Sequence, residues 1–197
     1  MRLIVAMTGA TGAVLGVRLL ETLRTRPDIE SHLVMSRWAR STIQTETDLS
    51  AAAVAKLADV VHKPDDLAAP IASGSFRTAG MVVVPCSMKT LAGIRTGYSS
   101  GLIGRAADVV LKERRRLVLV ARETPLSEVH LSNMLALRRM GADIVPPMPA
   151  FYNRPRTVDD LVDHLVARVL DQFGLDVPAR RWDGPPQPPR RRSSDGP

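Results

Sequence analysis

The residues best suited to chemistry begin with a loop of small side chains near the N-terminus, Thr8–Gly12, which follows an apolar run. Glycine and alanine let backbone N–H groups approach a ligand closely. The amphipathic stretch Gly12–Arg24 then predicts a helix whose N-terminus favours an anion. The pattern therefore predicts a strand, a phosphate-binding loop and a helix. A tight turn with no ligand is the simpler alternative.

The glycine spacing in this loop is similar to that of extended short-chain dehydrogenases, with Gly9, Gly12 and Gly16 in register. Those enzymes also need a Tyr-x-x-x-Lys catalytic pair. The only tyrosines here, Tyr98 and Tyr152, have leucine and arginine four positions later. The sequence therefore disfavours dehydrogenase chemistry.

A second loop, Cys86–Thr90, follows the apolar run Met81–Val84, which we expect Pro85 to end. Its two hydroxyls and consecutive amides lead into a helix, which predicts a second edge for an anion or a heterocycle. Cys86 itself suits a core position better than a nucleophile. Ser36, after another strand, either caps the next helix or donates to a phosphate.

Charged candidates lie further along the chain. Glu46, near a helix end, is more typical of a solvated carboxylate than of a functional one. Arg105 and Lys112 share one helix face, and a surface salt bridge between Asp108 and Lys112 is the simpler explanation of that pattern. Arg122-Glu123 directly follows a strand, where a parallel sheet binds ligands.

The loop Phe151–Pro155 places a phenol beside cations. The four histidines, in contrast, have no metal-ligand spacing, so we predict no catalytic metal. Their positions are His32, His62, His130 and His164.

These candidates must be held by alternating strands and helices. We predict strands at 3–7, 30–35, 59–62, 81–84, 117–120 and 143–145, and helices at 12–24, 38–45, 50–58, 91–95, 103–114, 126–139 and 158–173. The alternation predicts an α/β fold: a single-domain, three-layer Rossmann-like (flavodoxin-like) parallel sheet with helices on both faces. All the candidate loops then fall at the carboxyl edge of the sheet.

Composition limits the function classes. The net charge of the 197 residues is +7, but aromatic residues make up only 4%, so small anionic ligands are a better explanation than nucleic acid. The single cysteine suits a reducing cytoplasm, and we expect no membrane span or signal peptide. We predict one domain over residues 1–182 and a disordered, Pro/Arg-rich tail over 183–197.

Taken together, these motifs resemble the UbiX family of flavin prenyltransferases, in particular the branch found with phenolic (hydroxyarylic) acid decarboxylases. The resemblance covers about residues 1–182. The segments that carry it are 7–12, 35–36, 45–47, 72–75, 85–91, 104–113, 122–131 and 149–152.

The resemblance implies a flavodoxin-like subunit of a dodecamer that binds reduced FMN and dimethylallyl phosphate. Family members join the prenyl group to N5 and C6 of the flavin without a metal. The product, prenylated FMN, is the cofactor of UbiD-type decarboxylases that act on aromatic acids. The protein would therefore make a cofactor rather than decarboxylate a substrate itself.

The family's site residues carry over to matching positions. The FMN contacts would be Gly9, Ala10, Thr11, Ser36, Ser87, Met88, Lys89, Thr90 and Arg122. The prenyl-phosphate contacts would be Lys112, Tyr152 and Arg168, with Lys112 also catalytic. Other catalytic positions would be Glu46, Arg105 and Glu123.

Physical chemistry is consistent with these roles. Charge builds on the leaving phosphate, and prearranged Lys, Arg and Tyr donors stabilise it, while a glutamate such as Glu46 or Glu123 relays the flavin proton. The chain departs from the family at Thr11, where serine is common, and near 67–70, where several relatives have a tryptophan. Two alternatives stay open: an FMN-dependent cysteine decarboxylase, and a non-catalytic flavin-carrying accessory subunit of a decarboxylase.

Overall fold

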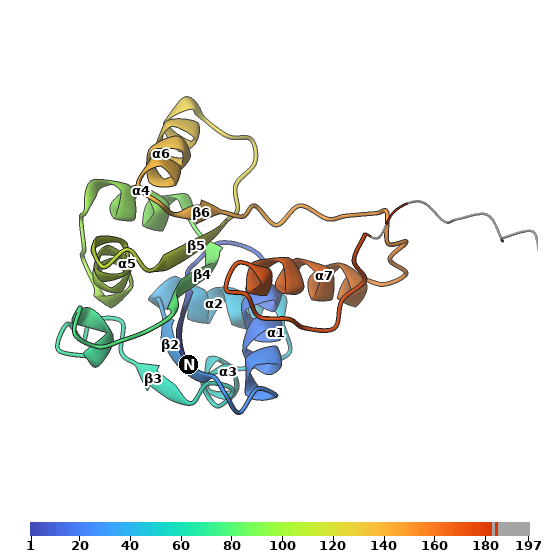
Figure 1. Ribbon diagram of the computed structural model, residues 1–197, viewed down its shortest axis with the longest axis horizontal. Helices are drawn as coiled ribbons and strands as arrows, with labels where there is room; N and C mark the ends of the chain where they lie inside the picture. The colour runs from blue at the N-terminus through green and yellow to red at the C-terminus, as the bar shows by residue number, and fades with distance from the viewer. Residues whose placement is uncertain (183, 185–197) are drawn as a thin grey trace, which may run out of the picture.

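The computed structural model describes residues 1–182 and 184, and its centre is one parallel six-stranded sheet. The strand order is β3-β2-β1-β4-β5-β6 (Figure 1). The strands are β1 (Arg2–Met7), β2 (Glu30–Met35), β3 (Val60–His62), β4 (Gly80–Cys86), β5 (Arg116–Ala121) and β6 (Asp143–Ile144). The order reverses between β1 and β4, so the sheet has its topological switch point there.

Helices cover both faces of the sheet, as predicted. They are α1 (Ala13–Arg24), α2 (Arg37–Glu46), α3 (Ala51–Ala55), α4 (Met88–Thr96), α5 (Leu102–Lys112), α6 (Glu128–Arg139) and α7 (Val158–Asp171), with a 3₁₀ turn η1 (Pro70–Ala72). One core joins α1, α2, α3 and α7 to one face of the sheet, and the other core joins η1, α4, α5 and α6 to the opposite face. The three-layer α/β prediction is therefore confirmed.

The strands alternate between these two cores along their length. In β1, for example, Val5 belongs to the α1/α7 core and Ile4 to the α4/α5 core. A strand buried on both faces needs apolar side chains at nearly every position, which is why the central strands β1, β4 and β5 are almost entirely apolar.

The prediction that Pro85 ends its strand was wrong, because β4 continues to Cys86. Pro85 has no N–H to give to the ladder, and the pairing of β4 with β5 shifts register between Val83 and Cys86. The strand therefore accommodates the proline through an irregular register. Ser87, the next residue after the strand, lies at the carboxyl edge of the sheet.

The predicted tail, residues 183–197, lies outside the described residues apart from Gly184. Among the helices that the structure describes, none is long and apolar enough to cross a membrane.

Candidate functional site

A cleft of about 690 Å³ lies at the switch point, beyond the carboxyl ends of β1, β2 and β4. Five predicted FMN contacts line it: Gly9, Ser36, Ser87, Lys89 and Thr90. The volume is in the range of small-molecule and cofactor sites, and the position is where open α/β sheets bind ligands.

The two serines hold helix N-termini toward this cleft. Ser36 Oγ accepts the Ala39 N–H at 3.1 Å and so caps α2, and Ser87 Oγ accepts the Thr90 N–H at 3.3 Å and so caps α4. Capping is thus one role of Ser36, as the sequence left open. The first turns of both helices present N–H groups and positive dipole ends at the cleft, which suits an anionic ligand.

Buried Thr8 ties the two central strands together beneath the cleft. Its Oγ1 donates to the Pro85 carbonyl at 2.8 Å and accepts the Ser87 N–H at 2.8 Å. Pro85 and Ser87 lie at the end of β4 and at the start of the second loop. The Thr8 side chain therefore fixes the position of the second loop relative to the first.

Gly9 is required for a reason that the sequence did not show. A Cβ built on Gly9 would lie 2.3 Å from the Cβ of Trp38, closer than real Cβ atoms approach. The first turn of α2 therefore packs directly on this loop. Arg37, Trp38 and Tyr98 also line the cleft and were missed, although Arg37 and Trp38 directly follow Ser36 in the sequence.

Glu46, the last residue of α2, caps the N-terminus of the neighbouring helix α1. Gly12 is the N-cap residue of α1 and has no side chain to cap it, and its φ of 101° suits glycine. Glu46 Oε2 accepts both the Gly12 and Ala13 N–H groups at 2.8 Å. Those two amides, predicted to face a ligand anion, are thus already paired with a carboxylate of the protein itself.

The other predicted flavin contacts lie at the same edge but not in the lining of the cleft. Ala10 and Thr11 belong to the first loop, whereas the Met88 side chain is buried in the α4/α5 core. The Arg122 N–H donates to the Cys86 carbonyl at 3.2 Å, which places Arg122 and the exposed Glu123 beside the second loop.

Tyr152 and Arg168 border a second hollow, an apolar pocket of about 280 Å³ on the α1/α7 side of the sheet. Its walls include Leu15, Val84 and Val120. The pocket and the cleft both take residues from the end of β4, since Val84 lines the pocket and Ser87 lines the cleft.

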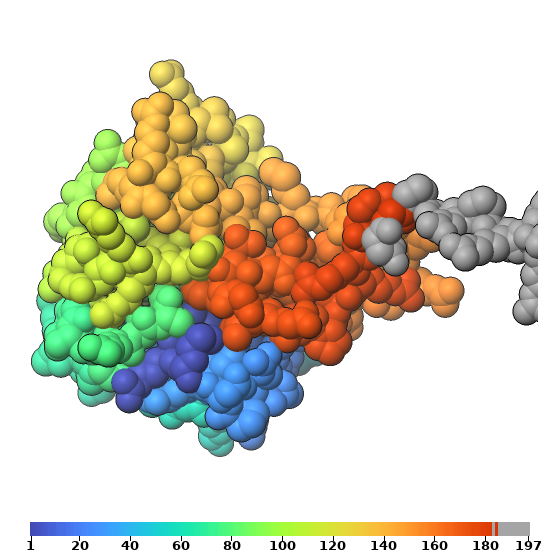
Figure 2. All heavy atoms as spheres, in the orientation of Figure 1, coloured from blue at the N-terminus to red at the C-terminus, as the bar shows by residue number. Residues whose placement is uncertain are grey.

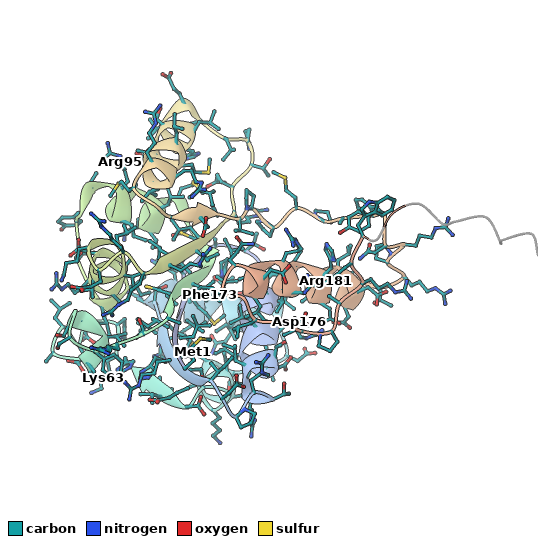
Figure 3. The ribbon with its side chains drawn as sticks, in the orientation of Figure 1. Met1, Lys63, Arg95, Phe173, Asp176 and Arg181 are labelled. Carbon is teal, nitrogen blue, oxygen red and sulfur yellow. The ribbon has the colours of Figure 1, made fainter. Side chains whose placement is uncertain are left out.

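Tyr152 and Arg168 both have partners in the chain. Tyr152 Oη lies 3.5 Å from His164 Nε2, and Arg168 donates to Asp171 at 2.6 Å. Arg181, which Figure 3 labels beside α7, donates to both Asp171 carboxylate oxygens. The pKa of Asp171 is lowered by these bonds from Arg181 and by the charge of Arg168, so its carboxylate stays ionised.

Arg105 and Lys112 form a third group on α5. Arg105 Nε donates to the Ala72 carbonyl at 3.1 Å and Nη1 to Asp108 at 2.9 Å, while Lys112 Nζ donates to Glu113 at 2.5 Å. The salt bridge considered between Asp108 and Lys112 is therefore not formed, since each residue pairs with another neighbour. The bond from Lys112 lowers the pKa of Glu113.

One copy of the chain does not bring Lys112 together with Tyr152 and Arg168. Lys112 ends α5, just before β5 begins at the amino edge of the sheet, about 12 Å along the helix from cleft residue Gly104. Arg168 lies on α7, which packs on the opposite face of the sheet (Figure 1).

Cys86 is a core residue, as predicted. It is fully buried, and burial raises the pKa of its thiol to about 12, which is unsuited to a nucleophile. Within residues 1–182 and 184, no group of three or more His, Cys, Asp or Glu side chains is arranged to hold a metal ion.

Comparisons with known sequences agree with this geometry. A family model described as Flavoprotein matches residues 1–170. A probable UbiX-like flavin prenyltransferase of Streptomyces sp. (strain D7) is 73% identical over 185 residues, covering 93% of this chain and 92% of that protein. The flavin prenyltransferase UbiX of Escherichia coli (strain K12) is 56% identical over 186 residues, covering 93% and 98%.

Solved structures extend the similarity. The dodecameric FMN-dependent UbiX-like decarboxylase of Escherichia coli O157:H7 is 70% identical, with a TM-score of 0.93 over 93% of this chain and 100% of that chain. AnUbiX (PadA1), in complex with FMN and dimethylallyl pyrophosphate, is 60% identical with a TM-score of 0.91 over 93% and 97%. The FMN-dependent cysteine decarboxylase SpaF is only 17% identical with a TM-score of 0.61, so it shares the fold alone.

The fold, the cleft at the switch point and the matched family model define a flavoprotein. Within that class, the chain belongs to the UbiX-like flavin prenyltransferase family.

Proposed function

We propose that the chain joins the dimethylallyl group of dimethylallyl phosphate to N5 and C6 of reduced FMN, giving prenylated FMN. The observation that carries this proposal is the pairing of two hollows at one edge of the sheet. One is a cleft of nucleotide size whose lining includes hydroxyl and cationic side chains, and the other is an apolar pocket bordered by a phenol and a guanidinium. Family membership and the ligands of AnUbiX support the same reaction.

The cleft fits FMN by its chemistry. Gly9 and the capped first turns of α2 and α4 offer close backbone approach and N–H groups, and Lys89 and Arg37 add positive charge. We assign Gly9, Ala10 and Thr11 to flavin binding, together with the residues at the starts of α2 and α4 and one residue after β5: Ser36, Ser87, Met88, Lys89, Thr90 and Arg122. Met88 would act through its backbone, because its side chain is in the core.

The apolar pocket suits a five-carbon prenyl group. Its aliphatic walls exclude water from a reactive allyl group, while Tyr152 and Arg168 donate hydrogen bonds to the leaving phosphate. The reduced flavin supplies the nucleophile. A carrier that only delivered flavin would need no second hollow with phosphate donors, so this pocket favours an enzyme over an accessory subunit.

Lys112 and Arg105 join this site from a second copy of the chain. The sheet separates Lys112 from Arg168 within one copy, so only an interface between copies lets both contact one phosphate. The dodecameric relative supports a dodecamer here. Helix α6, which projects at the top of Figure 2, leaves Val129, Leu131 and Leu135 more than half exposed, and such an apolar stripe suits burial in an assembly.

Glu46 and Glu123 are the candidates for moving the proton lost from the flavin. Both carboxylates lie at the carboxyl edge of the sheet, Glu46 bonded to the first loop and Glu123 after β5. The product would serve a UbiD-type decarboxylase of aromatic acids. We place the reaction in the cytoplasm, where a single free cysteine is kept reduced.

The test is an anaerobic incubation of the purified protein with reduced FMN and dimethylallyl phosphate or diphosphate, followed by mass spectrometry of the flavin. The proposal predicts the gain of one five-carbon unit. A protein that binds FMN but adds no such unit with either donor would instead be a flavin carrier. Release of carbon dioxide from a cysteine-terminated peptide would indicate the decarboxylase alternative.

A further inference from the structure

Trp38 is a large aromatic residue that lines the cleft and is exposed to solvent. It is 62% exposed, although indoles are usually well buried. The core-facing residues of α2 are Ala39 and Ile43, so Trp38 is not needed to pack this helix on the sheet. Within the part of one copy that the structure describes, its exposed apolar surface therefore has no structural explanation.

The position of Trp38 is nevertheless tightly fixed. Because Gly9 has no side chain, the Trp38 backbone and Cβ can pack directly against the first loop. Ser36 also caps the first turn of α2, which contains Trp38. A preformed aromatic side chain loses little conformational entropy when a ligand binds against it.

The surroundings of Trp38 combine aromatic and positive groups. The Arg37 guanidinium lies 5.6 Å from the centroid of the Trp38 ring. Tyr98, which is 71% exposed, lines the same cleft from the connection between α4 and α5. Aromatic walls beside a cation suit a ligand that joins an extended aromatic plane to a phosphate.

We propose that the indole of Trp38 contacts the ring system of the bound flavin and sets the preference of the cleft for ligands with an extended aromatic plane. This inference rests on the flavin-binding part of the proposed function. It does not depend on prenyl transfer.

The test compares FMN dissociation constants of Trp38→Ala, Trp38→Phe and the wild-type protein, measured by titrating flavin-free protein and following flavin fluorescence. Loss of an aromatic stacking contact should weaken FMN binding roughly tenfold in Trp38→Ala. Trp38→Phe keeps a π-face and should stay within about threefold of wild type. The matched control is Trp182→Ala, an indole of similar exposure that packs on Tyr152, which should leave FMN affinity unchanged.

Three results would overturn the inference while leaving prenyl transfer by the wild type untouched. In the first, Trp38→Ala binds FMN as tightly as wild type. In the second, Trp38→Phe binds as weakly as Trp38→Ala, so that the ring is not what matters. In the third, native mass spectrometry shows that Trp38→Ala forms smaller assemblies, which would make Trp38 a subunit contact.

Discussion

At the scale of single residues, Glu46 caps α1 in the structure and is, in our proposal, a candidate proton relay. Its two bonds to the Gly12 and Ala13 N–H groups replace the cap that a glycine N-cap lacks. A proton relay and a cap require different things of the side chain. A cap needs an oxygen acceptor, whereas a relay needs a group that can be protonated.

Substitution of Glu46 separates these two roles. Glu46→Gln keeps an oxygen acceptor, so we expect FMN binding and thermal stability close to wild type but much slower prenylation. Glu46→Ala loses the cap as well and should lower stability by about 1 kcal/mol. Melting temperature, FMN affinity and flavin mass gain measure the three effects. Unchanged turnover in Glu46→Gln would remove Glu46 from proton transfer.

The role of a residue could be predicted from its type where that role depends on a local hydrogen bond, but not where it depends on a contact with a distant part of the chain. The capping role of Ser36 was recognisable because a hydroxyl after a strand can cap the following helix in a local hydrogen bond. The reason for Gly9 was not recognisable, since it lies in the approach of Trp38 from another element. The pairing of Lys112 with Glu113 rather than Asp108 likewise depends on side-chain conformers that spacing does not fix.

At the scale of elements, a buried histidine pair links β2 to β3 below the loop that leads to the cleft. His32 Nε2–H donates to Glu30 Oε1 at 3.0 Å, which leaves Nδ1 of the neutral ring to accept from His62 Nε2–H at 3.0 Å. Phe76 packs edge-on against His32. A proton added to His32 Nδ1 would remove the acceptor that His62 uses.

We expect this pair to make stability fall on acidification. Burial lowers the pKa of both histidines below the ordinary 6.5, and the charge of His32 lowers the pKa of His62 further. Nearby carboxylates oppose this effect without reversing it: Glu30 and Asp59 raise the pKa of His32, and Asp66 raises the pKa of His62. Below pH 6.5 the unfolded chain therefore binds protons that the folded chain does not, so the free energy of unfolding decreases.

Melting temperature between pH 7.5 and 5.5 checks this linkage. His62→Gln, whose amide can still donate to His32 Nδ1 but does not titrate, should lose less stability across this range than wild type. An equal pH dependence in wild type and His62→Gln would contradict the assignment.

Some element boundaries followed from the sequence, such as the start of α7 at Val158, whereas α4 begins at Met88 rather than 91 and α3 ends at Ala55 rather than 58. The run at 81–84 was another exception, because β4 accommodates Pro85 through a shift in its register with β5. From the sequence alone, a proline is expected to end a strand because it lacks an N–H group. Whether the strand continues depends on how the neighbouring strand pairs with it.

At the scale of the whole molecule, the sheet separates the three candidate prenyl-phosphate contacts. Tyr152 and Arg168 lie on the α1/α7 side, and Lys112 lies on the α4/α5 side at the amino edge. Sequence spacing placed these residues on the correct elements. It did not predict their separation, because which face a crossover helix covers is set by the topology of the whole sheet. A prenyl-transfer site that uses all three residues must therefore be built by two copies of the chain together.

Co-expression of Lys112→Ala and Arg168→Ala subunits is the decisive experiment for such a shared site, with flavin mass gain as the readout. Each variant alone should prenylate reduced FMN very slowly, because every site lacks one phosphate donor. Mixed assemblies should recover about a quarter of the wild-type rate, since random assembly gives that share of sites both native residues. Mixed assemblies, confirmed by native mass spectrometry, that stay as slow as the separate variants would contradict a site shared between copies.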